Sequence, residues 1–172
     1  MSALSERSHI AACAALGAGV AASDPIFVPY LAGERTPFMD PHLRGSWHGL
    51  SLSTDRPALL RSVLEAVAHA VALGVDAVQA SGDLLPEVVP LVGGGTHDPA
   101  FRQLLADATG LALGVTDAPD SAVVGAGLLA AGLTSNPRAV ASREVVRPRP
   151  GAAELLNERR GRMVSYAVSK GT

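Results

Sequence analysis

The sequence is poor in several residue types, and each shortage excludes a class of protein. A single cysteine, Cys13, excludes an internal disulfide framework and a zinc site built on cysteines. Aromatic residues make up only 3% and charged residues 17% of the 172 residues. The apolar 48% is therefore mostly Ala, Val and Leu, which is typical of helices packed on a parallel sheet. A net charge of −2 provides no basic surface for nucleic acid. We expect a reducing, cytoplasmic setting.

The N-terminal residues imitate a secretory signal, because Arg7 precedes an apolar run that extends from Ile10 to Ala22. However, Glu6 and His9 dilute the leading charge, and the run is mostly Ala and Gly. The run is also too short and too weakly apolar to span a bilayer. We therefore predict an Ala-rich helix with a linker over residues 1–24 and no membrane association.

A glycine turn between a predicted strand and a predicted helix is the most informative stretch. The strand, the turn and the start of the helix follow one another as Val88–Val92, Gly93, Gly94, Gly95, Asp98 and Pro99. Glycines tolerate positive φ and have no Cβ, so another molecule can approach their backbone closely. Free N–H groups at a helix N-terminus suit a phosphate or a nucleotide. Such turns also occur as plain tight connections, so the turn alone leaves both interpretations open.

The remaining chain alternates between short strands and helices. Strands are predicted at Ile26–Leu31, Ser46–Leu52 and Leu111–Val115, and helices from Thr54 to Ser81, from Pro99 to Gly110, from Ala122 to Ala131 and around Ala152–Val168. Valines and leucines recur at helical spacing from Leu60 to Val78, which is the clearest amphipathic pattern in the chain. Gly125 and Gly127 predict a close neighbour of the helix that contains them. This order predicts an α/β layered fold with right-handed crossovers.

Two groups of polar residues are candidates for a site. Arg35, Asp40, His42 and Arg44 lie in an irregular loop, which is either a polar site or, as we favour, a connection held by its own charge pairs. Metal binding by His42 and His48 lacks the spacing of known ligand sets. Glu65 and His69 lie one helical turn apart, where a structural pair is the favoured interpretation.

Five segments resemble, in the same order, the FGGY family of carbohydrate kinases and especially its xylulose kinases. They are Phe27–Pro37 (family pattern PYLxGERTP), Asp40–Gly45 (DPxARG), Gly45–Glu65 (the second family signature, with Ala58 as a departure), Leu91–Asp107 (VGGGxxSxxxxQxxAD, with Gln103 in place) and Gly125–Gly127 (GAA). Each motif is weak alone, but five in the family's order indicate the family. The resemblance covers roughly Ala14 to Val140.

The resemblance implies an α/β fold of the ribonuclease-H-like or actin-like ATPase type, of which residues 25–140 form an incomplete C-terminal lobe. Residues 141–172 remain as a polar tail with a possible terminal helix. It also implies transfer of the γ-phosphoryl group of ATP, with Mg, to a sugar hydroxyl. By position, Gly93, Gly94, Gly95 and Asp98 would line the nucleotide, although the family usually has Asn or Ser in place of Asp98. Arg35 and Arg44 match positions that we interpret as structural.

The catalytic parts of the family have no counterpart in the sequence. Phosphoryl transfer needs a group that takes the hydroxyl proton, and neither the family's phosphate loop nor its aspartate base is present. We therefore predict no catalytic and no metal-ligating residues, and a chain that is inactive alone and cannot bind sugar without an N-terminal lobe. Its strands would lack neighbours, so we expect self-association or a partner polypeptide that completes the sheet. The alternatives are a non-enzymatic nucleotide-binding or interaction module, and an unrelated α/β protein whose glycine turn is structural.

Overall fold

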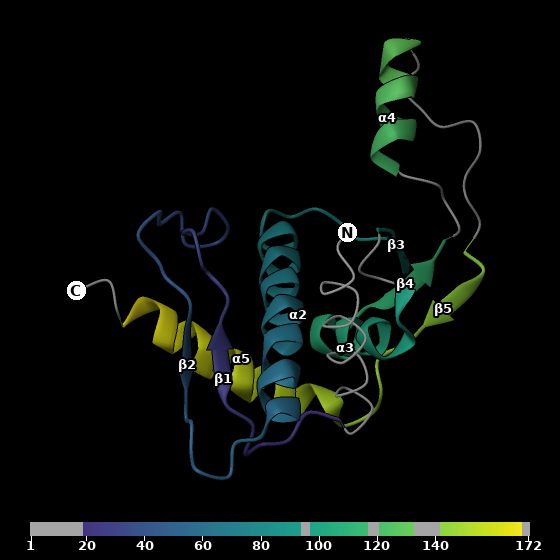
Figure 1. Ribbon diagram of the computed structural model, residues 1–172. Coiled ribbons are helices and arrows are strands. Elements are labelled where there is room, and N and C mark those ends of the chain that lie inside the picture. Colours follow the sequence, from purple (N-terminus) through teal and green to yellow (C-terminus); the bar gives the residue numbers. More distant parts are fainter. Residues whose placement is uncertain (1–18, 94–96, 117–120, 133–141, 170–172) are drawn as a thin grey trace, which may run out of the picture.

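A computed structural model of the chain describes residues 19–93, 97–116, 121–132 and 142–169. Its elements, in chain order, are β1 (Ile26–Val28), β2 (Ser46–His48), α2 (Arg56–Ala80), β3 (Val88–Leu91), α3 (Pro99–Thr109), β4 (Ala112–Val115), α4 (Ser121–Ala130), β5 (Glu144–Val146) and α5 (Ala152–Val168). The long helix α2 stands between two small sheets (Figure 1). One sheet pairs β1 with β2 antiparallel, and the other has the order β3-β4-β5. Within it β3 and β4 are parallel, whereas β5 is antiparallel to β4.

The strand predicted before the glycines and the helix predicted after them are confirmed. Asp98 is the N-cap of α3, Pro99 is its first residue, and Gly110 ends it with a φ of 70°. The two strands near the N-terminus are shorter than predicted, at three residues each. Pro29 cannot donate to a strand ladder, and Gly49 turns the chain with a φ of 78°. The Ala-rich helix predicted before residue 19 lies outside the described residues.

The helix α5 closes two hydrophobic cores, one on each side of α2. Its Leu156 packs with Phe101 and Leu113 of the α3 and β4 side. Its Met163 and Ala167 pack in the second core, which includes Ile26 and other residues of the β1 side. Figure 1 shows α5 running behind both parts. The helix predicted at the end of the chain is thus present and joins the two halves.

The helix α2 buries alanines and polar side chains and exposes three of its five valines. The buried set is Ala58, Ser62, Glu65, Ala66, Ala68, His69 and Ala72. Val67, Val71 and Val78 are 41, 44 and 43% exposed. An apolar stripe normally faces the core, but in this structure alanines allow α3 and β1 to pack closely on the opposite side. Among the described helices, α2 alone is long and apolar enough to cross a membrane, a test that core helices also pass.

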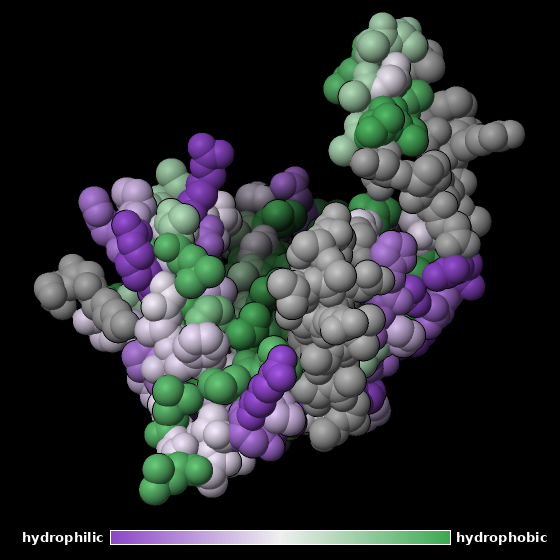
Figure 2. All heavy atoms as spheres, in the orientation of Figure 1, coloured by the Kyte–Doolittle hydropathy of each residue, from purple (hydrophilic) through white to green (hydrophobic). Residues whose placement is uncertain are grey.

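The helix α4 stands away from the rest of the molecule (Figures 1 and 2). It is apolar along its whole length, and Val123 and Leu129 are 66 and 77% exposed. The prediction of a close neighbour is wrong for the described structure, because a Cβ added at Gly125 or Gly127 would meet no atom within 4 Å. The apolar surface of α4 therefore has no extensive contact with another described element.

Candidate functional site

The carboxyl ends of the parallel strands β3 and β4 form the edge at which the glycine turn begins. Leu91 is paired with Val115, so Gly93 and Thr116 follow the two strands at the same edge of the sheet. Gly93 has a φ of 108°, and a Cβ added there would meet no atom within 4 Å. Open space therefore lies beside the backbone of Gly93. The Oγ1 atom of Thr116 is buried without a hydrogen-bond partner. Gly94 and Gly95 lie outside the described residues.

Asp98 uses its carboxylate to cap α3. Its Oδ1 atom accepts hydrogen bonds from the backbone N–H groups of Ala100 (2.8 Å) and Phe101 (3.1 Å). A phosphate at the start of α3 would therefore find these two donors occupied and a negative charge beside them.

The buried Arg102 ties the far end of the glycine turn to β5. Its Nη2 atom donates to the backbone carbonyl of His97 (3.1 Å), and its Nη1 atom lies 3.0 Å from Oε2 of Glu144. Arg102 is 5% exposed, so packing fixes the position of its side chain. The sequence alone did not predict this role of Arg102. The only indication was the presence of a charged residue on an otherwise apolar face of the helix.

Gln103 and Asp107 hold a different part of the chain, although both belong to the nucleotide-segment pattern. Oδ1 of Asp107 accepts from Nε2 of Gln103 (2.9 Å) and from the backbone N–H of Arg149 (2.7 Å). Gln103 also donates to the carbonyl of Arg147 at 2.9 Å. These residues fasten the segment between β5 and α5 to α3, so their role in this structure is structural.

The polar loop between β1 and β2 is held by hydrogen bonds between its side chains and its backbone, whereas the favoured interpretation predicted charge pairs. Oε1 of Glu34 accepts from the backbone N–H groups of Arg35 (2.7 Å) and Thr36 (2.9 Å). Arg44 donates to the carbonyls of Pro41 (2.9 Å) and Leu43 (2.7 Å). The guanidinium of Arg44 is thus used within the loop.

His42 contributes its backbone N–H to Oδ1 of Asp40 (2.7 Å), and the ring of His48 stacks on Tyr166. A shallow hollow of about 410 Å³ lies beside the loop, with Arg35 in its wall. Over the part of the chain that the structure describes, no group of three His, Cys, Asp or Glu side chains could hold a metal ion.

A buried ionic cluster joins α2, α5 and the chain that leads into β1. The predicted pair of Glu65 and His69 is present, with 3.0 Å between Oε1 and Nε2. Sequence reasoning missed the third member, Arg159, which donates to both carboxylate oxygens of Glu65 (2.6 and 2.8 Å). Arg159 is 1% exposed. Its remaining donors reach backbone carbonyls, those of Ala22, Asp24 and Pro25.

Hydrogen bonds keep the carboxylates of Glu65 and of the neighbouring Asp24 ionised. Burial would raise the pKa of Glu65, but hydrogen bonds from His69 and Arg159 outweigh it and hold the pKa below its usual value. The same holds for Asp24, where burial is outweighed by the guanidinium of Arg61, with contacts of 2.7 and 2.8 Å. Nδ1 of His69 is buried without a hydrogen-bond partner. The other charged groups of the cluster bond to one another and hold α2, α5 and the chain before β1 together, so its role in this structure is structural.

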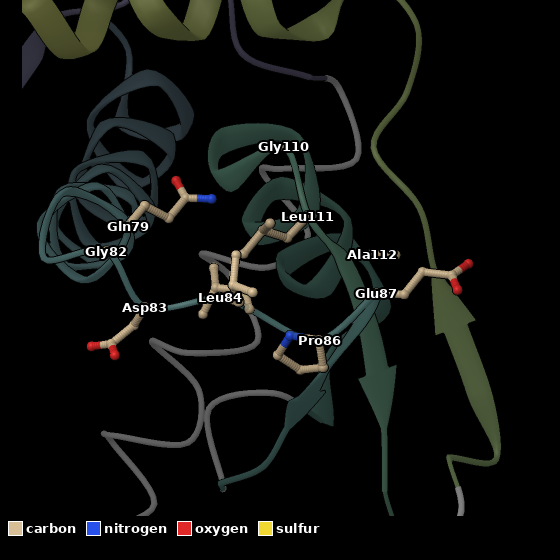
Figure 3. Close-up of a pocket in the computed structure, with 10 residues that line it drawn as sticks. Gln79, Gly82, Asp83, Leu84, Pro86, Glu87, Gly110, Leu111 and Ala112 are labelled. Atoms are coloured by element: carbon tan, nitrogen blue, oxygen red, sulfur yellow. The ribbon is translucent and has the colours of Figure 1, made fainter.

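A pocket lies beside the amino ends of β3 and β4, at the end opposite to Gly93 (Figure 3). Its volume is about 590 Å³, and residues 82–87 and 110–112 with Gln79 line it. In Figure 3 the carboxylates of Asp83 and Glu87 point away from each other, and Leu84 and Leu111 lie between them. With no convergent polar groups, this pocket lacks the features of a catalytic site.

Comparison with known proteins matches residues 2–133 to the C-terminal domain of the FGGY family of carbohydrate kinases. Xylulose kinase of Escherichia coli (strain K12) is 44% identical over 89 residues, which are 51% of this chain and 18% of that protein. Xylulose kinase of Bacillus subtilis (strain 168) is 29% identical over 112 residues, 65% of this chain and 22% of that protein.

Solved structures give the same result at the level of the fold. The xylulose kinase from Rhodospirillum rubrum has a TM-score of 0.74 at 26% identity, and the match covers 94% of this chain and 34% of that chain. Plasmodium falciparum glycerol kinase with ADP has a TM-score of 0.73 at 20% identity, covering 91% and 33%. The chain spans about a third of the length of these solved structures.

Proposed function

Because the chain belongs to the FGGY family of carbohydrate kinases, we propose that it serves the ATP-dependent phosphorylation of a sugar. Family membership and the actin-like ATPase fold, both predicted from the ordered motifs, are confirmed by the family match and the solved neighbours. The observation that carries the proposal is the open space beside Gly93, at the carboxyl edge of β3 and within the matched domain. Relatives named as xylulose kinases favour xylulose as the sugar.

In this proposal the chain supplies the nucleotide-binding side of the kinase. Gly93, Gly94, Gly95 and Asp98 line ATP, and the space beside Gly93 fits close approach of a ligand to the backbone. Since Asp98 occupies the first donors of α3, it lies on the nucleoside side. Mg would neutralise charge on the phosphates. It would arrive bound to ATP.

The proposed setting is cytoplasmic, and the sugar is bound only together with an N-terminal lobe. The chain would then be inactive alone and would associate with itself or with a partner polypeptide. The second candidate function is a non-enzymatic nucleotide-binding or interaction module derived from a sugar kinase. It is favoured by Asp98, whose carboxylate stands where the family usually has an amide or a hydroxyl.

An ADP-release assay separates these functions. The chain with MgATP and xylulose is expected to release no ADP above the buffer control. Turnover that appears only on co-expression with the N-terminal lobe of a xylulose kinase supports the kinase. ADP formation by the chain alone would contradict its inactivity, whereas a stable complex with that lobe that remains inactive favours the second candidate.

Replacing Arg102 with glutamine is expected to weaken binding of MgATP about tenfold, because the far end of the glycine turn loses its anchor on the His97 carbonyl. Isothermal titration calorimetry measures the effect. Arg149→Gln is the matched control, since Arg149 contacts the other end of α3 at Asp107. Equal loss of affinity in both variants would show that Arg102 acts only through general stability.

A further inference from the structure

A buried hydroxyl at the carboxyl end of β4 forms no hydrogen bond within the chain. Among the described residues, three buried side-chain atoms lack a hydrogen-bond partner: Oη of Tyr30, Nδ1 of His69 and Oγ1 of Thr116. Tyr30 lies in the core of the β1 side, and His69 lies in the buried ionic cluster. Of the three, only Thr116 lies at the edge of the sheet where the glycine turn begins. Because buried polar groups are nearly always bonded, this hydroxyl needs an explanation.

The strand register places Thr116 beside the start of the glycine turn. The last pair of the parallel ladder between β3 and β4 is Leu91 with Val115. The next residues along the two strands are Val92 and Thr116, and adjacent strands lie about 4.8 Å apart. Thr116 therefore lies beside the residue that precedes Gly93, where the backbone has open space next to it.

The hydroxyl of Thr116 also lies beside exposed apolar surface. Leu91 and Val115 pack in the core that contains α3. Since successive side chains of a strand point to opposite faces, Val92 and Thr116 both point away from α3. Val92 is 44% exposed. The edge thus combines apolar surface, a hydroxyl and an accessible glycine backbone, and small-molecule sites are built from apolar surface with a few placed polar groups.

We infer that the Thr116 hydroxyl binds the nucleotide beside the glycine turn. The inference rests on the proposed function and adds a binding residue to it. A threonine hydroxyl both donates and accepts, so it suits a ribose hydroxyl or a phosphate oxygen. Thr116 is only partly buried, so a change of its χ1 rotamer brings Oγ1 towards the edge. The unbonded hydroxyl costs stability in the free chain, and a bound nucleotide supplies the missing partner.

Thr116→Val tests the inference, because valine keeps the shape of threonine and lacks only the hydroxyl. In isothermal titration calorimetry this variant is expected to bind MgATP about three- to tenfold more weakly, which is the effect of one neutral hydrogen bond. Its urea denaturation midpoint is expected to equal or exceed that of the wild-type chain, since an unbonded buried hydroxyl is removed. A residue with a purely structural role would not weaken binding without a loss of stability. Thr116→Ser keeps the hydroxyl and is expected to retain affinity within about twofold.

Thr109→Val is the matched control. Oγ1 of Thr109 donates to the carbonyl of Leu105 (2.7 Å) at the end of α3 away from the glycine turn. This variant is therefore expected to lose stability and to keep its affinity for MgATP.

The possible failures of the inference and of the proposed function are distinguishable. If the wild-type chain and Thr116→Val bind MgATP equally well, the inference is overturned and the proposed function stands. A loss of stability in Thr116→Val with unchanged affinity would show that the hydroxyl is bonded in solution by water, and would also overturn the inference. Absence of MgATP binding by the folded wild-type chain would contradict the proposed function, and the inference with it.

Discussion

Replacing Arg159 with alanine is expected to lower the free energy of unfolding by about 3–5 kcal/mol. The substitution leaves the carboxylate of Glu65 buried with only His69 beside it, and three backbone carbonyls lose their donors. Because Arg159 connects α5 with α2 and with the chain before β1, the loss affects both cores. Urea denaturation followed by circular dichroism measures the change.

Two further variants test whether the loss of stability in Arg159→Ala comes from the buried ionic cluster. Arg160→Ala is the matched control, because Arg160 contacts the half-exposed Asp76 and surface ion pairs contribute only about 0–1 kcal/mol. The double variant Glu65→Leu with Arg159→Met is expected to be more stable than Arg159→Ala, since it removes both buried charges. A loss below about 1 kcal/mol in Arg159→Ala would contradict the role assigned to the cluster.

Replacing Asp107 with alanine is expected to cost about 2–3 kcal/mol. The side chain of Asp107 is fully buried and accepts from Gln103 and from the backbone and side chain of Arg149. The alanine variant leaves the backbone N–H of Arg149 without its acceptor, and the segment between β5 and α5 loses its attachment to α3. Thermal unfolding of the variant and the wild-type chain, under identical conditions, gives the comparison.

Arg149→Gln separates the contribution of the Arg149 guanidinium from that of the Arg149 backbone N–H, since both donate to Asp107. Its guanidinium is 63% exposed, so the loss of this side chain is expected to cost no more than about 1 kcal/mol. The backbone N–H remains bonded to Asp107 in this variant. If Arg149→Gln destabilised the chain as much as Asp107→Ala, the ion pair rather than the backbone contact would be the important interaction.

Local chemistry made the region of the glycine turn predictable. Asp98 and Pro99 are strong start signals for a helix, and Gly110 is a strong end signal, because each acts through its own backbone geometry and nearest donors. The polar loop was predicted to be held by charge pairs among its own residues. Glu34 and Arg44 do bond to residues within a few positions, but their partners are backbone groups.

Features that depend on distant residues could not be predicted. Arg159 and Glu65 are 94 positions apart, and nothing in the sequence near either residue indicates the other. Which side of α2 is buried also depends on the elements that cover it. Its alanines admit α3 and β1, so the side with the smaller residues is buried. The role of Arg102 could not be predicted because Glu144 reaches it only when β5 pairs with β4.

Calorimetric titration of the chain with MgATP, in the absence of sugar and of any other polypeptide, tests the central proposal most directly. The proposed nucleotide-binding side predicts saturable binding with one site per chain. It also predicts that Gly93→Val weakens this binding, because a β-branched side chain is strained at a φ of 108° and fills the open space beside the turn. Absence of any binding by the folded wild-type chain would contradict the proposal and leave the glycine turn as a structural connection.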